Sequence, residues 1–174
     1  IQEDSRFARS YSGLCRVHIR LYEGNNSAED FEAAERACNR ALTLQSTDSD
    51  AYIALSNLYL YSGQEDLAES QIREAIRLDP DNVDAYLTLG RIPHNLKKPT
   101  EALAAYNQAV SKQPGHWRSF NARGIHYYRL GEYPQAIADF TQVAFLDPTN
   151  TSALNNLGTA RYLNGEFSAA IASW

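Results

Sequence analysis

Residues 117–150 read WRSFNARGIHYYRLGEYPQAIADFTQVAFLDPTN, and this stretch decides the fold because its pattern recurs along the chain. Its closing proline, Pro148, has counterparts at Pro114 and Pro80, spaced 34 residues apart. A fixed period of this size is typical of one supersecondary unit stacked on itself. The sequence therefore predicts a repeat array with a long continuous surface, rather than one globular core around a closed catalytic cavity.

Each repeat is predicted to form two helices. The first helix has packing residues at the i, i+3, i+4, i+7 spacing of one helical face, here Phe120, Arg123, Gly124 and Tyr127. The small residue in this set lets a second helix approach closely. A glycine then follows at the left-handed helix ending, as in Ser62-Gly63, Leu130-Gly131 and Asn164-Gly165. The second helix continues at i, i+4, i+7 with Ala136, Phe140 and Val143.

This pattern resembles the tetratricopeptide repeat over residues 49–174, because the small, aromatic and proline positions recur in register. The resemblance implies an all-α fold, a right-handed α-α superhelical solenoid of stacked antiparallel helix pairs. The first helix of each pair would line a concave groove. Within a single array over residues 1–174, the predicted repeats are 49–82, 83–116, 117–150 and a truncated 151–174.

A longer first repeat is predicted over residues 3–46. Tyr11, Leu14, Cys15 and His18 match a first helix, and Phe31, Ala34, Cys38 and Ala41 match a second. Their separation exceeds that of the next repeat by seven residues, close to two helical turns. We therefore expect each helix to be about one turn longer, with a loop at residues 24–27. The lengthened pattern is similar to repeats appended to bacterial signalling proteins such as cyclases and kinases.

The third repeat contains a proline, Pro93, where the family has an aromatic residue. Proline removes a helical hydrogen bond and clashes with the preceding turn, so the helix should kink or end near Arg91 or Ile92. Lys97 replaces the turn glycine, which predicts an irregular loop over residues 95–99. The break is either tolerated local damage or a change that reshapes the groove beside Arg91 and His94.

No chemistry of catalysis or metal binding is predicted. The four histidines lie in different repeats without ligand spacing, and no glycine-rich phosphate loop or nucleophile elbow is present. Cys15 and Cys38 have no metal or redox spacing; small buried thiols are the favoured interpretation, and a disulfide across the first helix pair is the alternative. The sequence therefore predicts a protein without catalytic residues, metal or cofactor, and not an enzyme.

Composition and charge disfavour some classes of partner. The net charge of −5 disfavours non-specific nucleic-acid binding, and no apolar run is long enough to insert into a membrane. Residues 1–82 carry eight basic and fifteen acidic side chains, whereas residues 83–174 carry eight and six, so an acidic partner should prefer the second half. The absence of methionine and the end within a repeat predict a fragment of a longer protein. The compartment stays open; we expect a soluble segment in either the cytoplasm or the periplasm.

The predicted function is the binding of an extended peptide or partner-protein segment in the concave groove, as a regulatory or scaffolding part of a larger protein. Arginine would bind carboxylates, asparagine the peptide backbone, and tyrosine apolar side chains. The predicted partner-binding residues are Asn57, Arg91, His94, Arg118, Asn121, Tyr128, Arg129, Asn155 and Tyr162. The alternative is a homo-oligomer, formed by end-to-end stacking or by dimerisation through exposed terminal helix faces that include Trp174.

Overall fold

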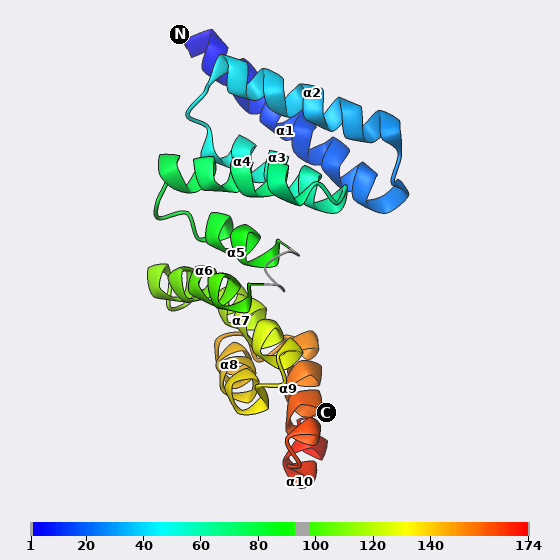
Figure 1. Ribbon diagram of the computed structural model, residues 1–174, viewed down its shortest axis with the longest axis vertical. Helices are drawn as coiled ribbons and strands as arrows, with labels where there is room; N and C mark the ends of the chain where they lie inside the picture. The colour runs from blue at the N-terminus through cyan, green and yellow to red at the C-terminus, as the bar shows by residue number, and fades with distance from the viewer. Residues whose placement is uncertain (1, 93–97, 174) are drawn as a thin grey trace. The chain divides into compact units, whose positions relative to one another are not determined.

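The computed structural model describes residues 2–92 and 98–173, with side chains from residue 6 onward. Its elements are α-helices, and α1–α2, α3–α4, α7–α8 and α9–α10 pack as antiparallel pairs, which confirms the all-α repeat fold (Figure 1). The helices are α1 (Gln2–Asn25), α2 (Ala28–Leu44), α3 (Ser49–Tyr61), α4 (Glu65–Leu78), α5 (Val83–Arg91), α6 (Pro99–Lys112), α7 (Trp117–Arg129), α8 (Tyr133–Leu146), α9 (Thr151–Leu163) and α10 (Phe167–Ile171).

The chain divides into two compact units. Unit 1 comprises Ile1–Lys98 with helices α1 to α5, and unit 2 comprises Pro99–Trp174 with helices α6 to α10. The third predicted repeat is thus shared between them, since α5 belongs to unit 1 and α6 to unit 2. That all repeats form one continuous array stays a prediction.

Local signals at the helix ends explain where the helices begin and end. The side chains of Asp48, Asn82 and Asn150 precede α3, α5 and α9 and accept hydrogen bonds from backbone N–H groups of the first turn. After the first helix of three pairs, Gly63, Gly131 and Gly165 have φ of 74°, 77° and 83°. These are the left-handed endings that the sequence predicts, in a region that glycine occupies without steric cost.

The first helix pair is longer than the next, with 24 and 17 residues in α1 and α2 against 13 and 14 in α3 and α4. The loop is shorter than the predicted 24–27, because Gly24 and Asn25 are still helical and only residues 26–27 connect the helices. Asn26 makes this tight turn with a φ of 53°, and the Asn25 side chain accepts a hydrogen bond from the Ser27 N–H at 2.9 Å.

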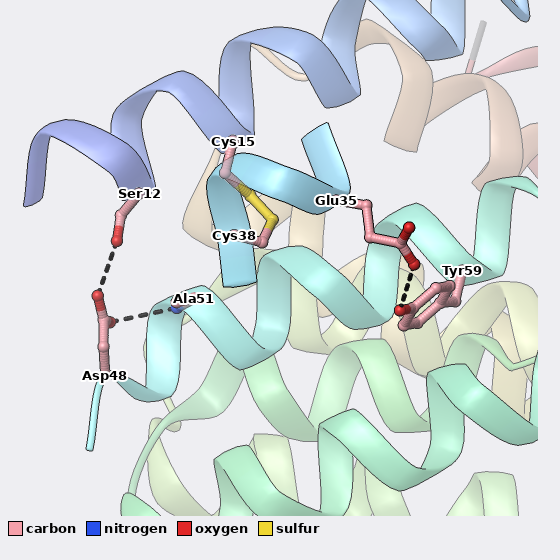
Figure 2. The surroundings of a disulfide bond; sticks show 7 residues. All are labelled: Ser12, Cys15, Glu35, Cys38, Asp48, Ala51 and Tyr59. Atoms are coloured by element: carbon pink, nitrogen blue, oxygen red, sulfur yellow. Dashed lines mark hydrogen bonds between the residues drawn. A yellow bond between two sulfur atoms is a disulfide. The ribbon is translucent and has the colours of Figure 1, made fainter. Parts of the chain in front are cut away.

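A disulfide joins Cys15 of α1 to Cys38 of α2 (Figure 2). Both residues are fully buried and their Cα atoms are 5.0 Å apart. The prediction of free thiols is therefore wrong. The antiparallel pairing brings both cysteines to the shared contact between the two helices, on the apolar stripes that suggested burial in the first place.

Two hydrogen bonds fasten the first helix pair to α3 (Figure 2). Ser12 of α1 donates to the Asp48 carboxylate at 2.8 Å, and Tyr59 of α3 donates to the Glu35 carboxylate of α2 at 2.7 Å. Burial, together with the bond to Glu35, raises the pKa of the Tyr59 hydroxyl to about 12. The first pair is thus held at both ends of α3.

Helix α5 ends at Arg91, with Ile92 as its C-cap, where Pro93 predicts that it should. Ile92 is 1% exposed and anchors this end in the core of unit 1. Pro93 itself, His94 and most of the predicted irregular loop lie outside the described residues.

In unit 2, α7 and α8 approach closely at Gly124. A Cβ atom added there would lie 2.8 Å from Cε1 of Phe140 and 3.2 Å from Cβ of Asp139, so only glycine fits without displacement of a side chain. Beside this contact, Arg123 makes a bidentate ion pair with Asp139, at 2.8 Å from Nε and 2.7 Å from Nη2. The Asp139 side chain is only 6% exposed.

His126 is expected to make the stability of unit 2 depend on pH. Its ring is buried between α6 and α7, lies 5.6 Å from the Tyr106 ring, and donates from Nε2 to the Pro99 carbonyl at 3.1 Å. Burial lowers the pKa of His126 below its ordinary 6.5, against the opposing effects of the Pro99 bond and Glu132. As the pH falls below 6.5, the unfolded chain takes up a proton before the folded one does, so unit 2 should lose stability.

This expectation is measurable through tryptophan fluorescence, because Trp117 and Trp174, the two tryptophans of the chain, both belong to unit 2. The urea concentration at the midpoint of the fluorescence transition should be lower at pH 5.5 than at pH 7.5. In His126→Gln, which retains an N–H donor but does not titrate, the fall should be smaller. An equal decrease of the midpoint in both proteins would assign the pH dependence of stability to groups other than His126.

Candidate functional site

A cleft of about 420 Å³ opens on unit 1 between the first helices of the repeats. Helix α1 contributes four residues, α3 five and α5 one. The lining residues are Arg16, Ile19, Arg20, Glu23, Asp50, Ile53, Ala54, Asn57, Tyr61 and Asp84.

Helical periodicity places these residues together. On α1 they follow i, i+3, i+4, i+7, and on α3 they follow i, i+3, i+4, i+7, i+11, the spacings of a single helical face. Buried Ile19 and Ile53 give the cleft an apolar floor, and exposed charges of both signs form its walls. Two arginines come from α1, and two aspartates come from the first turns of α3 and α5.

Asn57 is the most informative residue of the cleft. Its Oδ1 atom is buried and has no hydrogen-bond partner among the described residues. A buried acceptor without a donor loses the bond that it would make to water, a cost of about 1–3 kcal/mol. A hydrogen-bond donor that reached this atom, such as a peptide N–H, would offset that cost.

Of the predicted binding residues, Asn57 lines the cleft. Arg91 also belongs to unit 1, and it is exposed at the last residue of α5 but does not line the cleft. His94 lies outside the described residues. Their predicted roles in binding stay predictions.

The other predicted residues lie on two neighbouring helices of unit 2. Arg118, Asn121 and Tyr128 share a face of α7, and Arg129 ends that helix. Arg118 stands 5.5 Å above the Trp117 ring, and Tyr128 packs edge-on against Tyr133 at 5.9 Å. On α9, Asn155 and Tyr162 are both exposed and are spaced i, i+7. We call these six residues together the α7–α9 surface; within it, Tyr128 is only partly exposed and packs against the core of unit 2.

The charged walls of the cleft were not predicted. Arg16, Arg20 and Glu23 follow the i, i+4, i+7 spacing of a helix face, and this signal was available in the sequence. It was missed because only the packing stripe of the first helix was followed. Asp50 and Asp84 are 34 residues apart, so the repeat period itself marks them as equivalent.

In the described part of the chain, no group of three or more His, Cys, Asp and Glu side chains is arranged to hold a metal ion. None of the described helices combines the length and apolarity required to cross a bilayer.

Several solved structures share this fold. MamA from Desulfovibrio magneticus RS-1 is 17% identical, with coverage of 96% of this chain and 90% of that one and a TM-score of 0.74. TTC0263, a TPR protein of Thermus thermophilus, is 21% identical, with coverage of 94% and 87% and a TM-score of 0.73. YrrB, described as a TPR protein with an unusual peptide-binding site, is 23% identical, with coverage of 90% and 80% and a TM-score of 0.64.

No curated protein sequence gives a significant match to the chain. A family model for the tetratricopeptide repeat, in contrast, matches residues 53–116 and 121–174. These matches cover more than half of the chain and coincide with the helix pairs and turn glycines described above. The chain therefore belongs to the tetratricopeptide repeat family.

Proposed function

We propose that this chain is a non-enzymatic binding module, and that an extended segment of a partner protein binds in the unit 1 cleft. The observation that carries the proposal is the buried, unpartnered Oδ1 of Asn57 above an apolar floor. A peptide backbone supplies an N–H group to this atom, and its side chains meet arginine or aspartate at the walls. The peptide-binding site reported for YrrB lends support from a protein of the same fold.

The α7–α9 surface serves as a second contact for the partner. Its arginines, Arg118 and Arg129, are exposed and suit carboxylate groups, and Asn121, Tyr128, Asn155 and Tyr162 supply amide and aromatic contacts. Residues 83–174 carry more basic than acidic side chains, so this part of the chain favours an acidic segment. Arg91, the last residue of α5 in unit 1, and His94 are proposed as further contacts for the partner.

The cleft is tested with peptides selected from a random display library on the intact chain. Fluorescence anisotropy of a selected peptide then compares the wild type with Asn57→Ala, for which we expect at least tenfold weaker binding, about 1.4 kcal/mol. Asn39→Ala is the matched control, since Asn39 is exposed on α2 and does not line the cleft. Equal affinity of the Asn57→Ala and Asn39→Ala proteins would exclude the cleft as the binding site.

The α7–α9 surface is tested separately by the double substitution Arg118→Glu/Arg129→Glu. This variant should bind acidic peptides more weakly and should still bind neutral peptides in the cleft. Unchanged affinity for acidic peptides would remove this surface from the proposal.

A further inference from the structure

Helix α1 presents an apolar stripe to solvent on the side away from its buried face. Phe7, Leu14, Val17 and Leu21 are 58%, 49%, 53% and 47% exposed. Their spacings of seven, three and four residues are those of the a and d positions of a heptad. The buried face of the same helix consists of other residues, Ala8, Ser12, Cys15 and Ile19. The stripe is therefore not part of the core of unit 1.

A row of arginines runs beside this stripe. Arg6, Arg9, Arg16 and Arg20 are exposed and have spacings of three, seven and four residues, so they follow the same heptad period. Since Arg6, Arg16 and Arg20 each immediately precede a stripe residue, the row lies about 100° around the helix from the stripe. Residues 6–22 contain no aspartate or glutamate, although the whole chain has a net charge of −5. Among the described side chains, these four arginines make no ion pair.

We propose that the outer face of α1 is a second binding surface, and that it binds an acidic amphipathic helix of a partner protein. An a/d stripe fits the apolar seam of another helix, and the arginine row pairs with carboxylates that flank that seam. The surface shares Arg16 and Arg20 with the walls of the cleft, but it includes neither Asn57 nor the cleft floor and does not depend on the function proposed for Asn57.

Two other occupants fit the observations less well. A second copy of α1 supplies no carboxylate within residues 6–22: in an antiparallel pair the arginine rows face each other, and in a parallel pair Arg6 faces Tyr11 and Arg20 faces Asn25. A lipid surface favours an apolar face wider than a strict a/d stripe, which is the narrower seam used between helices. The stripe and its charge together therefore indicate a helical, acidic protein partner.

The test uses two labelled 21-residue peptides with leucine at every a and d position. One carries glutamate at the e and g positions, and the other carries lysine there. Fluorescence anisotropy should show that the intact chain binds the glutamate peptide at least tenfold more tightly than the lysine peptide. Higher salt should weaken this binding, because the arginine row is exposed.

Variants then locate the surface. The variants are two double substitutions at exposed positions outside the core, Leu14→Ser/Leu21→Ser and Arg6→Gln/Arg9→Gln. Each should weaken binding of the glutamate peptide at least tenfold. Leu67→Ser on α4 and Arg40→Gln on α2 are matched controls at exposed positions and should have no effect. Asn57→Ala should also have no effect, which separates this result from that of the cleft.

Three outcomes would overturn the proposal. The first is equal affinity for the two peptides, or binding that survives Leu14→Ser/Leu21→Ser. The second is binding of phosphatidylglycerol vesicles through the same residues without discrimination between the peptides. The third is a concentration-dependent dimer in sedimentation analysis that the Leu14→Ser/Leu21→Ser substitutions abolish.

Discussion

Asp139→Ala should lower the free energy of unfolding of unit 2 by about 3 kcal/mol. The substitution leaves the Arg123 guanidinium in a site where it is four-fifths buried and retains only the Asn107 side-chain oxygen, at 2.8 Å, as a hydrogen-bond partner. Loss of one partner from a buried ion pair is costly because the remaining charge has neither water nor a counter-charge around it. Urea denaturation followed by tryptophan fluorescence reports this change, since both tryptophans lie in unit 2.

The double variant Arg123→Leu/Asp139→Ala is the decisive control. Leucine stands at the equivalent of Arg123 in the other repeats, Leu55, Leu89 and Leu157, and alanine at the equivalent of Asp139 in one of them, Ala105. Removal of both charges should restore stability to within about 1 kcal/mol of the wild type, because an apolar pair of suitable size replaces the ion pair. If the double variant were as unstable as Asp139→Ala, lost packing rather than an unpaired charge would be the cause.

Cys15→Ala/Cys38→Ala should lower the stability of unit 1 by about 3 kcal/mol. The disulfide closes a loop with a sequence separation of 23 residues, which restricts the unfolded chain more than the folded one. Reduction of the wild type with dithiothreitol should have the same effect. Far-UV circular dichroism should show a lower unfolding midpoint for unit 1, while the midpoint of the tryptophan transition of unit 2 should not change.

The same reductant supplies the control, since it should not change the unfolding of the double variant. A wild-type protein equally stable with and without dithiothreitol would mean that the disulfide contributes no stability. A shift in the tryptophan transition would mean that unfolding of the two units is coupled.

The repeat period predicts most of the helical framework. The 34-residue spacing of the prolines locates the helix pairs, the turn glycines have the predicted left-handed φ, and Pro93 places the end of α5 at Arg91. These features are local: they depend on backbone chemistry at a single position or on the spacing within one helix. A short stretch of sequence therefore contains all the information needed to predict them.

Pairings between helices are harder to predict. Cys15 and Cys38 each lie on an apolar stripe, and burial as free thiols explains the same spacing as well as a disulfide does. Asp139 is a comparable case, because its partner Arg123 lies on the preceding helix, in a packing position that leucine occupies elsewhere. A charged residue in an otherwise apolar position of a repeat should therefore prompt a search for its counter-charge on the adjacent helix.

The candidate site was predictable only in part. Asn57 follows from the face of α3 opposite its packing stripe, but the charged walls depend on how α1, α3 and α5 lie around one cleft. Alignment of Cys15 with Ser56, the small residue of the next first helix, places Arg16 and Arg20 at the positions of Asn57 and Tyr61, so the sequence did contain a signal for them.

The disulfide also has a mechanical consequence. If the chain is pulled by its two ends, the segment between Cys15 and Cys38, with a sequence separation of 23 residues, cannot extend while the bond is intact. At about 3.5 Å per extended residue, the oxidised chain should reach a contour length about 80 Å shorter than the reduced chain. A force applied at the N-terminus therefore passes from α1 through the disulfide into α2. It does not extend the residues between Cys15 and Cys38.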